Sequence, residues 1–351
     1  MFLVDPRTAE PVPRSLAVGA VDDARPDGVP EDVTQELFLE QVETTTEPDL
    51  ALDDVFGHVV AARRRAAADA RAVGAALLPS STSVVGRPSV VTPSDRYRRM
   101  AARHRDLFPD VAVCGMHVHV EIVDDEEAVR VVDRLAPWLP VVAALTAGSP
   151  FAAGADTGFA SWRSRQWDRW PTAGPTAPFG SAAAYRRVVE GLVASGAAID
   201  DGMVYLDARP GRATPTVEVR VCDVLADPAE AVAVAGLVRA LVTTVAATEV
   251  EPWTVPVLRA ARWLAQRDGL TAGLLHPVTA RLVPAARATD ALLSFVEGTL
   301  RRAGDLDPVA AAVGRLVADG GPATRARRVA DGEPRRWAQH LVRSTQEGLH
   351  G

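Results

Sequence analysis

Hydrophobic residues recur at two spacings along the chain, and each spacing predicts a different kind of element. Across residues 49–78, apolar or small residues return every three or four positions, which is the period of an amphipathic helix. Across residues 111–122, polar and apolar residues alternate, which is typical of a strand. Successive side chains of a strand point to opposite faces, so His117, His119 and Glu121 are predicted to share one face.

The remaining segments follow the same two patterns. We expect an irregular surface segment over residues 5–30 and a long Gly-, Ser-, Pro- and Trp-rich loop over residues 148–180. Strands interleaved with helices, followed by a helical tail, predict one α+β domain over residues 1–351. Strands are predicted at 34–46, 203–209 and 216–224, the last two as a hairpin, and further helices at 94–108, 124–147 with a break near Pro140, 181–198, 229–248, 256–266 and 290–303.

Composition narrows the protein class. The chain has 351 residues, of which 48% are hydrophobic, so it can bury a large core without disulfide bonds. Its two cysteines, Cys114 and Cys222, lie in apolar runs and are interpreted as core thiols. No stretch approaches the ~20 uninterrupted apolar residues that span a bilayer, and no signal peptide is apparent, so we expect a cytoplasmic protein without membrane contact. The net charge of −7 argues against nucleic-acid binding.

The basic residues exclude several mechanisms. All 38 of them are arginine, because the sequence contains no lysine. A Walker A lysine, a Schiff base and a lysine-dependent adenylylating ligase are therefore excluded. Any phosphate chemistry must rest on metal ions, backbone amides and arginine, whose planar fork can hold phosphate bidentately.

Two strands carry the candidate chemistry. His117 and His119 at strand spacing can ligate a metal, although polar side chains on a wet face would look the same. Glu218 and Arg220 share a face of the later strand. If that face is also the one with His117, carboxylates, imidazoles and guanidiniums line one cavity, which suits metal-assisted phosphoryl transfer. The alternative is an exposed face with ordinary Glu–Arg pairs.

Other residues add weaker signals. Tyr205, Asp207 and Arg209 are predicted to share a face of the neighbouring strand. Glu43 is a further carboxylate in an acidic segment, and Arg163 in the long loop could reach an anionic ligand. The residues alone leave the role of that loop undecided.

The chain resembles the glutamate-cysteine ligase type 2 family, the bacterial carboxylate-amine ligases, over nearly its whole length. Several long motifs carry the resemblance in order and spacing: the His-Val-His-Val strand from His117, Asp-Thr-Gly-Phe-Ala-Ser-Trp-Arg ending at Arg163, Trp-Pro-Thr-Ala-Gly-Pro from Trp170, Asp-Ala-Arg-Pro from Asp207 and Pro-Thr-Val-Glu-Val-Arg ending at Arg220. The resemblance implies a glutamine-synthetase-like fold, in which a curved, mainly antiparallel sheet forms a funnel with helices outside and a helical C-terminal part.

The resemblance also implies a reaction and its cofactors. ATP would phosphorylate a carboxylate, and an amine would displace phosphate from the acyl-phosphate to form an amide, with Mg²⁺ as the metal and L-glutamate and L-cysteine as the default substrates. Position by position, it implies Mg²⁺ ligation by Glu43, His117 and Glu218. It implies catalytic and ATP-binding roles for Arg220 and Arg209, ATP binding by Tyr205, and a further candidate group of His119, Glu121 and Arg163.

One departure from the family pattern leaves alternatives open. Family members usually open with a Gly-Val-Glu-Glu-Glu run, expected to bind Mg²⁺-ATP, and this sequence begins at Met1 just after that point. A start placed too far downstream and a catalytically impaired ATP- or amino-acid-binding homologue are both consistent with this. A hydrolase built on the His117–His119 pair is a weaker alternative, and a homodimer stays open.

Overall fold

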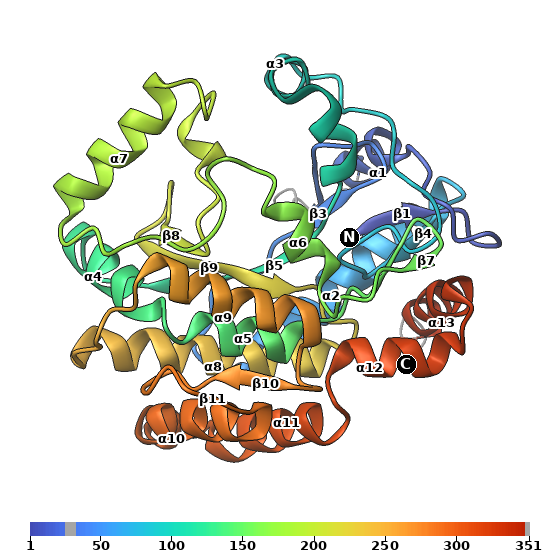
Figure 1. The fold of residues 1–351 in the computed structure, drawn as a ribbon. Helices are drawn as coiled ribbons and strands as arrows, with labels where there is room; N and C mark the ends of the chain where they lie inside the picture. The colour runs from blue at the N-terminus through green and yellow to red at the C-terminus, as the bar shows by residue number, and fades with distance from the viewer. Residues whose placement is uncertain (25–32, 348–351) are drawn as a thin grey trace.

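A three-stranded antiparallel sheet crosses the middle of the molecule (Figure 1). The computed structural model describes residues 1–24 and 33–347. The strand order is β5 (Gly115–Glu121), β9 (Thr216–Asp223) and β8 (Ala208–Pro210). The predicted hairpin of β8 and β9 is confirmed, with Arg209 opposite Glu218.

The alternation of the central strands divides their side chains between two faces. Val118 and Val120 of β5, together with Val217 and Val219 of β9, belong to the main hydrophobic core. His119 is paired with Glu218 across the sheet, so the polar residues gather on the other face. A β-bulge between Met116 and Val118 shifts the register near His117.

Helices cover the apolar face of this sheet (Figure 1). The helix α8 (Pro228–Ala247) lies at their centre, and its apolar side chains are packed in the main core. It is the one described helix long and apolar enough to cross a membrane, but 67% of that window is buried inside the protein, as expected of a core helix. It packs against α2 (Leu52–Ala72), α4 (Asp125–Leu135), α5 (Leu139–Thr146), α10 (Ala285–Ala303) and α11 (Leu306–Ala318), and α9 (Val255–Asp268) packs against α5.

The N-terminal part differs from the prediction of an irregular segment. It contains β1 (Phe2–Val4), paired with β4 (Ala76–Leu78), and the helix α1 (Ser15–Asp23). Residues 25–32 lie outside the described part. The helix was missed because it has only nine residues, with Ser15, Val18 and Asp22 as its buried positions. The strand predicted at 34–46 is a short antiparallel pair, β2 (Val33–Gln35) and β3 (Val42–Thr44).

Two helical segments rise on the polar side of the sheet, one at each end (Figure 1). One is α3 (Asp95–His104) with the 3-10 helix η1 (Arg105–Val111), and the other is α7 (Ala182–Ala194). Ser94 caps α3 as predicted, because its side chain accepts a hydrogen bond from the Tyr97 amide at 3.1 Å. The predicted long loop contains β6 (Phe151–Ala152), β7 (Ala155–Asp156) and the short helix α6 (Trp162–Trp167).

The C-terminal part is helical, as predicted, with one hairpin that the prediction lacked. That hairpin, β10 (Gly273–Leu275) with β11 (Leu282–Pro284), packs beside α10. The last described elements are α12 (Pro322–Ala330) and α13 (Pro334–Glu347), and a short 3-10 helix, η2 (Asp201–Met203), precedes β8.

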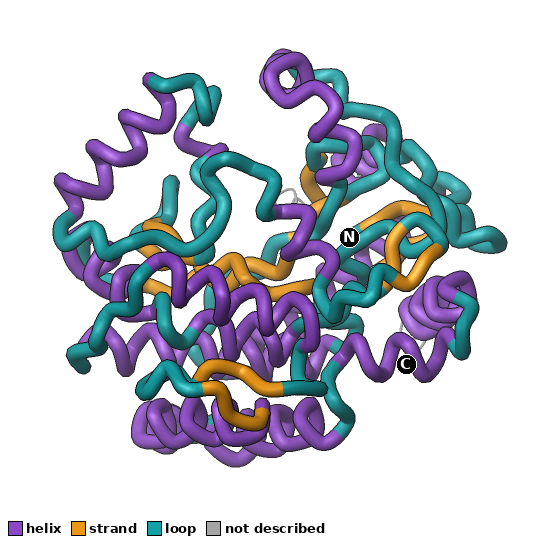
Figure 2. Tube along the Cα trace, in the orientation of Figure 1, coloured by secondary structure: helices purple, strands orange, loops and turns teal. Residues whose placement is uncertain are grey.

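The predicted α+β class and its mainly antiparallel pairing are confirmed. Figure 2 shows the strands as short segments between helices and loops. The antiparallel strands form one three-stranded and four two-stranded sheets among the described residues. The strands are therefore divided among more sheets than the strand pattern suggested. The polar face of the central three-stranded sheet is bordered by α3, α7 and the loop that contains α6.

Candidate active site

Glu218 is the centre of the polar cluster on the sheet. Its carboxylate is buried, with 5% of the side chain exposed, although it carries a charge. One oxygen, Oε2, accepts a hydrogen bond from Arg209 Nε at 2.7 Å, and the other, Oε1, is bound by an Arg220 terminal nitrogen. Two guanidiniums thus hold one buried carboxylate from neighbouring positions of β8 and β9.

The two predicted histidines lie beside the same carboxylate. Nδ1 of His117 is 3.2 Å from Oε1 of Glu218, and Nε2 of His119 is 3.9 Å from it. His119 also shares a hydrogen bond with the Thr216 hydroxyl at 3.1 Å. The structure therefore places His117, Glu218 and Arg220 on one face, which was the condition set by the sequence. The alternative, an exposed surface of ordinary Glu–Arg pairs, is wrong.

The charges of the cluster depend on one another. Burial alone would raise the pKa of Glu218, but Arg220 and Arg209 outweigh it and keep the pKa below its usual value. Burial, followed by the nearby Arg220, holds the pKa of His117 well below its usual value. At neutral pH the cluster therefore contains an ionised carboxylate, two guanidiniums and a neutral imidazole.

One hydrogen-bond donor of the Arg220 guanidinium is unpaired within the described part of the chain. Its Nε is buried and has no hydrogen-bond partner among the residues that the structure describes. Its guanidinium carbon lies 6.0 Å from the centre of the Tyr205 ring, a cation–π arrangement. A buried donor without a partner costs free energy.

Tyr205 forms part of an aromatic wall at the edge of the cluster. Its ring centre lies 4.6 Å from that of Trp167 and 5.3 Å from that of Trp170. Burial raises the pKa of its hydroxyl to about 12, so the phenol stays protonated. The predicted role of Tyr205 in holding ATP stays a prediction, with the ring placed beside Arg220.

Glu43 lies on the separate strand β3. Its side chain is accessible to solvent but surrounded by protein, and the resulting desolvation raises its pKa to about 7, with repulsion from Glu36 as the next cause. Arg220 and Glu218 also influence this pKa, which places Glu43 within electrostatic reach of both. Glu121, in contrast, is exposed at the end of β5, opposite Thr216.

Arg163 requires a correction. We expected it to reach an anionic ligand, but it is buried and lies behind β9, where it donates to the backbone carbonyl of Arg220 at 2.8 Å. It also faces the buried Asp223 at 3.6 Å. The pattern of its loop could not reveal this, because the partners are carbonyl groups of a distant strand.

Asp223 was not singled out as a functional residue, yet it anchors the loop next to the cluster. Its carboxylate accepts hydrogen bonds from Ser149 Oγ at 2.6 Å, Ser161 Oγ at 2.9 Å and the Gly148 amide at 3.0 Å. The available signal was an aspartate at the end of a strand, directly after the apolar residues Val221 and Cys222. These contacts fix the segment that carries Arg163 against the end of β9.

Comparison with known proteins assigns the chain to a family. The model of glutamate-cysteine ligase family 2 matches residues 1–344. The chain belongs to this family. A protein from Nocardioides sp. named "Putative glutamate--cysteine ligase 2-1" is 46% identical over 341 residues, covering 93% of this chain and 88% of that protein. A Streptomyces coelicolor protein, "Putative glutamate--cysteine ligase 2", is 42% identical over 330 residues, covering 91% and 89%.

Solved structures share the fold of this family-2 chain at low sequence identity. A glutamate-cysteine ligase from Francisella tularensis, solved in complex with AMP, matches with a TM-score of 0.72 at 12% identity, covering all of this chain and 87% of that one. A bifunctional glutathione synthetase from Pasteurella multocida also has a TM-score of 0.72, at 14% identity, covering 99% of this chain and 51% of that one. The fold of this chain is therefore that of glutamate-cysteine ligases.

The candidate site offers few side chains that could bind Mg²⁺. Among residues 1–24 and 33–347, no group of three or more His, Cys, Asp or Glu side chains is arranged to hold a metal ion. Mg²⁺ bound with ATP needs only one or two protein carboxylates beside phosphate oxygens and water. Glu218 and Glu43 are the two carboxylates proposed for that smaller requirement. A hydrolase built on His117 and His119 would need a larger ligand group and finds no support in the described residues.

Proposed function

We propose that this chain is an ATP-dependent carboxylate-amine ligase that forms an amide through an acyl-phosphate, with L-glutamate and L-cysteine as its first substrates to test. The observation that carries the proposal is the buried Glu218, held between Arg209 and Arg220 beside His117. A structural neighbour supports a nucleotide as one ligand, because the glutamate-cysteine ligase from Francisella tularensis was solved in complex with AMP.

The arginines have the roles that phosphoryl transfer requires. In the first step the substrate carboxylate attacks the γ-phosphorus of ATP, ADP leaves, and negative charge is spread over the phosphoryl oxygens. A positioned guanidinium offsets that charge, and such arginines contribute roughly 10³- to 10⁵-fold in rate. In the proposed reaction Arg220 has this role, and Arg209 is a second contact for the anion. In the second step the amine attacks the acyl carbon and phosphate leaves.

Glu218 positions both arginines before the substrates bind. Arg209 is also fixed by a hydrogen bond to the Val204 carbonyl at 2.9 Å, so it cannot move far from Glu218. When bound, Mg²⁺ would be held by Glu218 and Glu43 and would neutralise charge on the ATP phosphates. His117 and His119 border the carboxylate as polar neighbours. Mg²⁺ ligation by His117 stays a prediction, and imidazole nitrogens are less suited to a hard cation than carboxylate oxygens are.

The test is release of inorganic phosphate from ATP and Mg²⁺ with pairs of amino acids. Glutamate with cysteine is the first pair, followed by other acids and amines, each omitted in turn. We expect phosphate release that needs both an acid and an amine, together with an amide product detected by mass spectrometry. Absence of phosphate release with every pair, by protein that still binds ATP, would support the impaired homologue instead.

A further inference from the structure

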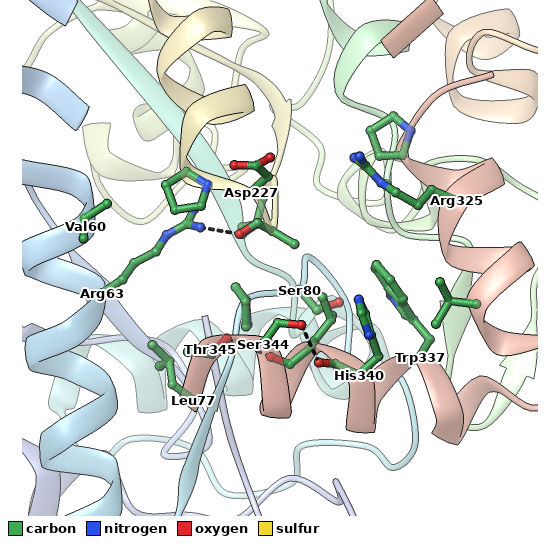
Figure 3. Close-up of a pocket in the computed structure, with 18 of the residues that line it drawn as sticks. Val60, Arg63, Leu77, Ser80, Asp227, Arg325, Trp337, His340, Ser344 and Thr345 are labelled. Atoms are coloured by element: carbon green, nitrogen blue, oxygen red, sulfur yellow. Dashed lines mark hydrogen bonds between the residues drawn. The ribbon is translucent and has the colours of Figure 1, made fainter. Parts of the chain in front are cut away.

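Several arginines hold distant segments of this chain together. In the cavity of about 400 Å³ that Figure 3 shows, Arg63 of α2 donates to the backbone carbonyl of Ala226 at 2.7 Å and to that of Leu225 at 2.8 Å. On the opposite side of this cavity Arg325 of α12 forms a bidentate ion pair with Glu230 of α8, at 2.8 and 2.6 Å. Both guanidiniums therefore join one element to another inside the protein.

Arg262 of α9 joins segments in the same way next to the candidate active site. The residue is buried, with 8% of its surface exposed. Nη1 of its guanidinium lies 2.5 Å from Oδ1 of Asp168, and Nε lies 3.4 Å from Oδ1 of Asp207. Nη2 donates to the Ser164 hydroxyl at 3.3 Å. One guanidinium therefore connects α9 to α6, to the residue that follows α6 and to the segment that leads into β8.

Gln266, one turn later in α9, holds the same end of α6. Its side-chain nitrogen donates to Ser164 Oγ at 3.1 Å and to Asp168 Oδ2 at 2.9 Å. Its backbone carbonyl accepts a hydrogen bond from the Ser161 amide at 2.9 Å. The contact between α9 and α6 is therefore secured twice, and Arg262 adds the contact with Asp207.

Asp207 is connected through its backbone to the residues proposed for the reaction. Its carbonyl accepts a hydrogen bond from the Arg220 amide at 2.9 Å, and its own amide donates to the Gly174 carbonyl at 3.3 Å. Tyr205 lies two residues before it and Arg209 two residues after it. The position of Asp207 therefore sets how the segment with Tyr205 and Arg209 lies against β9 at Arg220.

The Asp207 carboxylate depends on Arg262 for its counter-charge. Burial raises the pKa of Asp207, Arg262 is the largest influence that lowers it, and the charge of Asp168 raises it again. Loss of the guanidinium would remove the cation that both carboxylates share, so repulsion between them would favour their separation.

We propose that Arg262 is a positioning residue of the ligase site, which holds Asp207 so that its carbonyl stays on the Arg220 amide. Arg262 acts on the reaction through Asp207 and Arg220. Its effect on catalysis rests on the proposed function, whereas its effect on the strand contact does not. The two effects can therefore be measured separately.

The strand contact is tested by hydrogen–deuterium exchange of single backbone amides, followed by NMR. Arg262→Gln removes the cation, and Asp207→Asn removes the charge of its partner while keeping the backbone carbonyl. We expect the Arg220 amide to exchange roughly tenfold faster in both variants, because local opening of this contact becomes easier. The double variant should exchange no faster than Arg262→Gln alone, since both changes break one contact.

Two controls separate this local effect from a loss of overall stability. The Leu3 amide, which donates to the Glu40 carbonyl at 2.8 Å in the N-terminal part, should exchange at the wild-type rate in both variants. Arg259→Gln makes the same charge change at an exposed position of α9 and should leave the Arg220 amide unchanged.

The effect on the reaction is tested by steady-state phosphate release. We expect Arg262→Gln and Asp207→Asn to lower kcat about 10-fold or more, as for other small misplacements of a catalytic group, with KM for ATP changed by less than about threefold. Arg259→Gln should keep both constants.

The outcomes distinguish this proposal from the proposed function. Wild-type exchange of the Arg220 amide in both variants, or equal acceleration of the Arg220 and Leu3 amides, would overturn the proposal. Faster exchange at Arg220 with an unchanged kcat would overturn the role of Arg262 in the reaction. A wild-type protein that releases no phosphate would contradict the proposed function instead, and the Arg220 amide would still decide whether Arg262 holds Asp207.

Discussion

The buried guanidinium of Arg163 donates a hydrogen bond to the backbone carbonyl of Arg220 at 2.8 Å, from behind the strand that carries the Arg220 side chain. A second donor of Arg163 lies 3.4 Å from the Val221 carbonyl. Arg163 therefore fixes the backbone of β9 at the point where Arg220 leaves it. We therefore propose that Arg163 is a positioning residue, which acts through Arg220 in the proposed reaction.

Replacement of Arg163 by lysine tests that role. An ammonium group keeps the charge facing Asp223 but cannot hold two carbonyls in a fixed plane. We expect kcat to fall about 10- to 100-fold, as for other small misplacements of a catalytic group, while KM for ATP changes by less than about threefold. Arg165→Lys on the exposed side of α6 is the matched control and should leave both constants unchanged. A lower melting temperature with an unchanged kcat would indicate a purely structural residue.

Gly115 gives a second test of the same contact. A Cβ built at Gly115 would lie 2.3 Å from a terminal nitrogen of Arg163, so Gly115→Ala must displace that guanidinium. We expect a reduced kcat in the same direction as for Arg163→Lys. Gly191→Ala in α7, where a Cβ meets nothing within 4 Å, should keep full activity. A fully active Gly115→Ala protein would argue that the position of Arg163 does not matter.

Arg220 itself should be needed for chemistry more than for binding. Arg220→Ala removes the guanidinium proposed to offset charge on the transferring phosphoryl group, and a decrease of roughly 10³-fold or more in kcat is expected. Arg220→Lys should restore little, since a point charge cannot hold Glu218 and a phosphoryl oxygen together. Steady-state kinetics with ATP as the varied substrate distinguish the two effects. A kcat within threefold of wild type in either variant would exclude Arg220 as the phosphoryl contact.

Glu218→Gln should affect stability as well as activity. The substitution leaves Arg209 and Arg220 buried without their shared carboxylate, and removing one partner of a buried ion pair costs about 3 kcal/mol or more. We therefore expect loss of phosphate release together with a lower urea midpoint. Glu297→Gln, whose partner Arg301 lies on the exposed face of α10, should change the midpoint little. An unchanged midpoint in Glu218→Gln would mean that the arginines find other partners.

Strand periodicity predicted which side chains of each strand share a face, whereas the pairing of β5 with β9 that brings His117 to Glu218 was only a conditional expectation. A period of two fixes which side chains share a face, and the antiparallel register then places Arg209 opposite Glu218. Helices with strong caps were also predictable: Ser94 and Ser181 begin their helices in the sequence as in the structure. These are local signals, each readable within about ten residues.

The features that the sequence did not predict correctly depend on contacts between distant segments. Arg163 lies in a Gly- and Trp-rich loop, and nothing near it indicates that its partners are carbonyls of β9. The segment predicted as one strand at 34–46 divides into β2 and β3 with no Gly or Pro between them, so the turn had no local signal. Tertiary packing also gives α1 its helical form despite the surrounding Pro and Asp residues.

The pH dependence of stability offers a test of Glu43 that does not need catalysis. Its pKa is raised to about 7 in the folded protein, from an ordinary value of 4.5, so between these pH values the folded state holds a proton that the unfolded state has lost. Stability from this group is therefore present below about pH 4.5 and is lost as the pH rises towards 7. Above about pH 7 the loss of stability caused by the ionised Glu43 carboxylate is complete.

Glu43→Gln removes this penalty. We expect the variant to melt above the wild type at pH 8, by on the order of 1–2 °C because water screens the solvent-accessible side chain, and to show no gain at pH 4.5. Glu47→Gln, a nearby exposed glutamate, should show the same difference from wild type at both pH values. A gain for Glu43→Gln that did not depend on pH would mean that packing, and not the carboxylate charge, limits stability at this position.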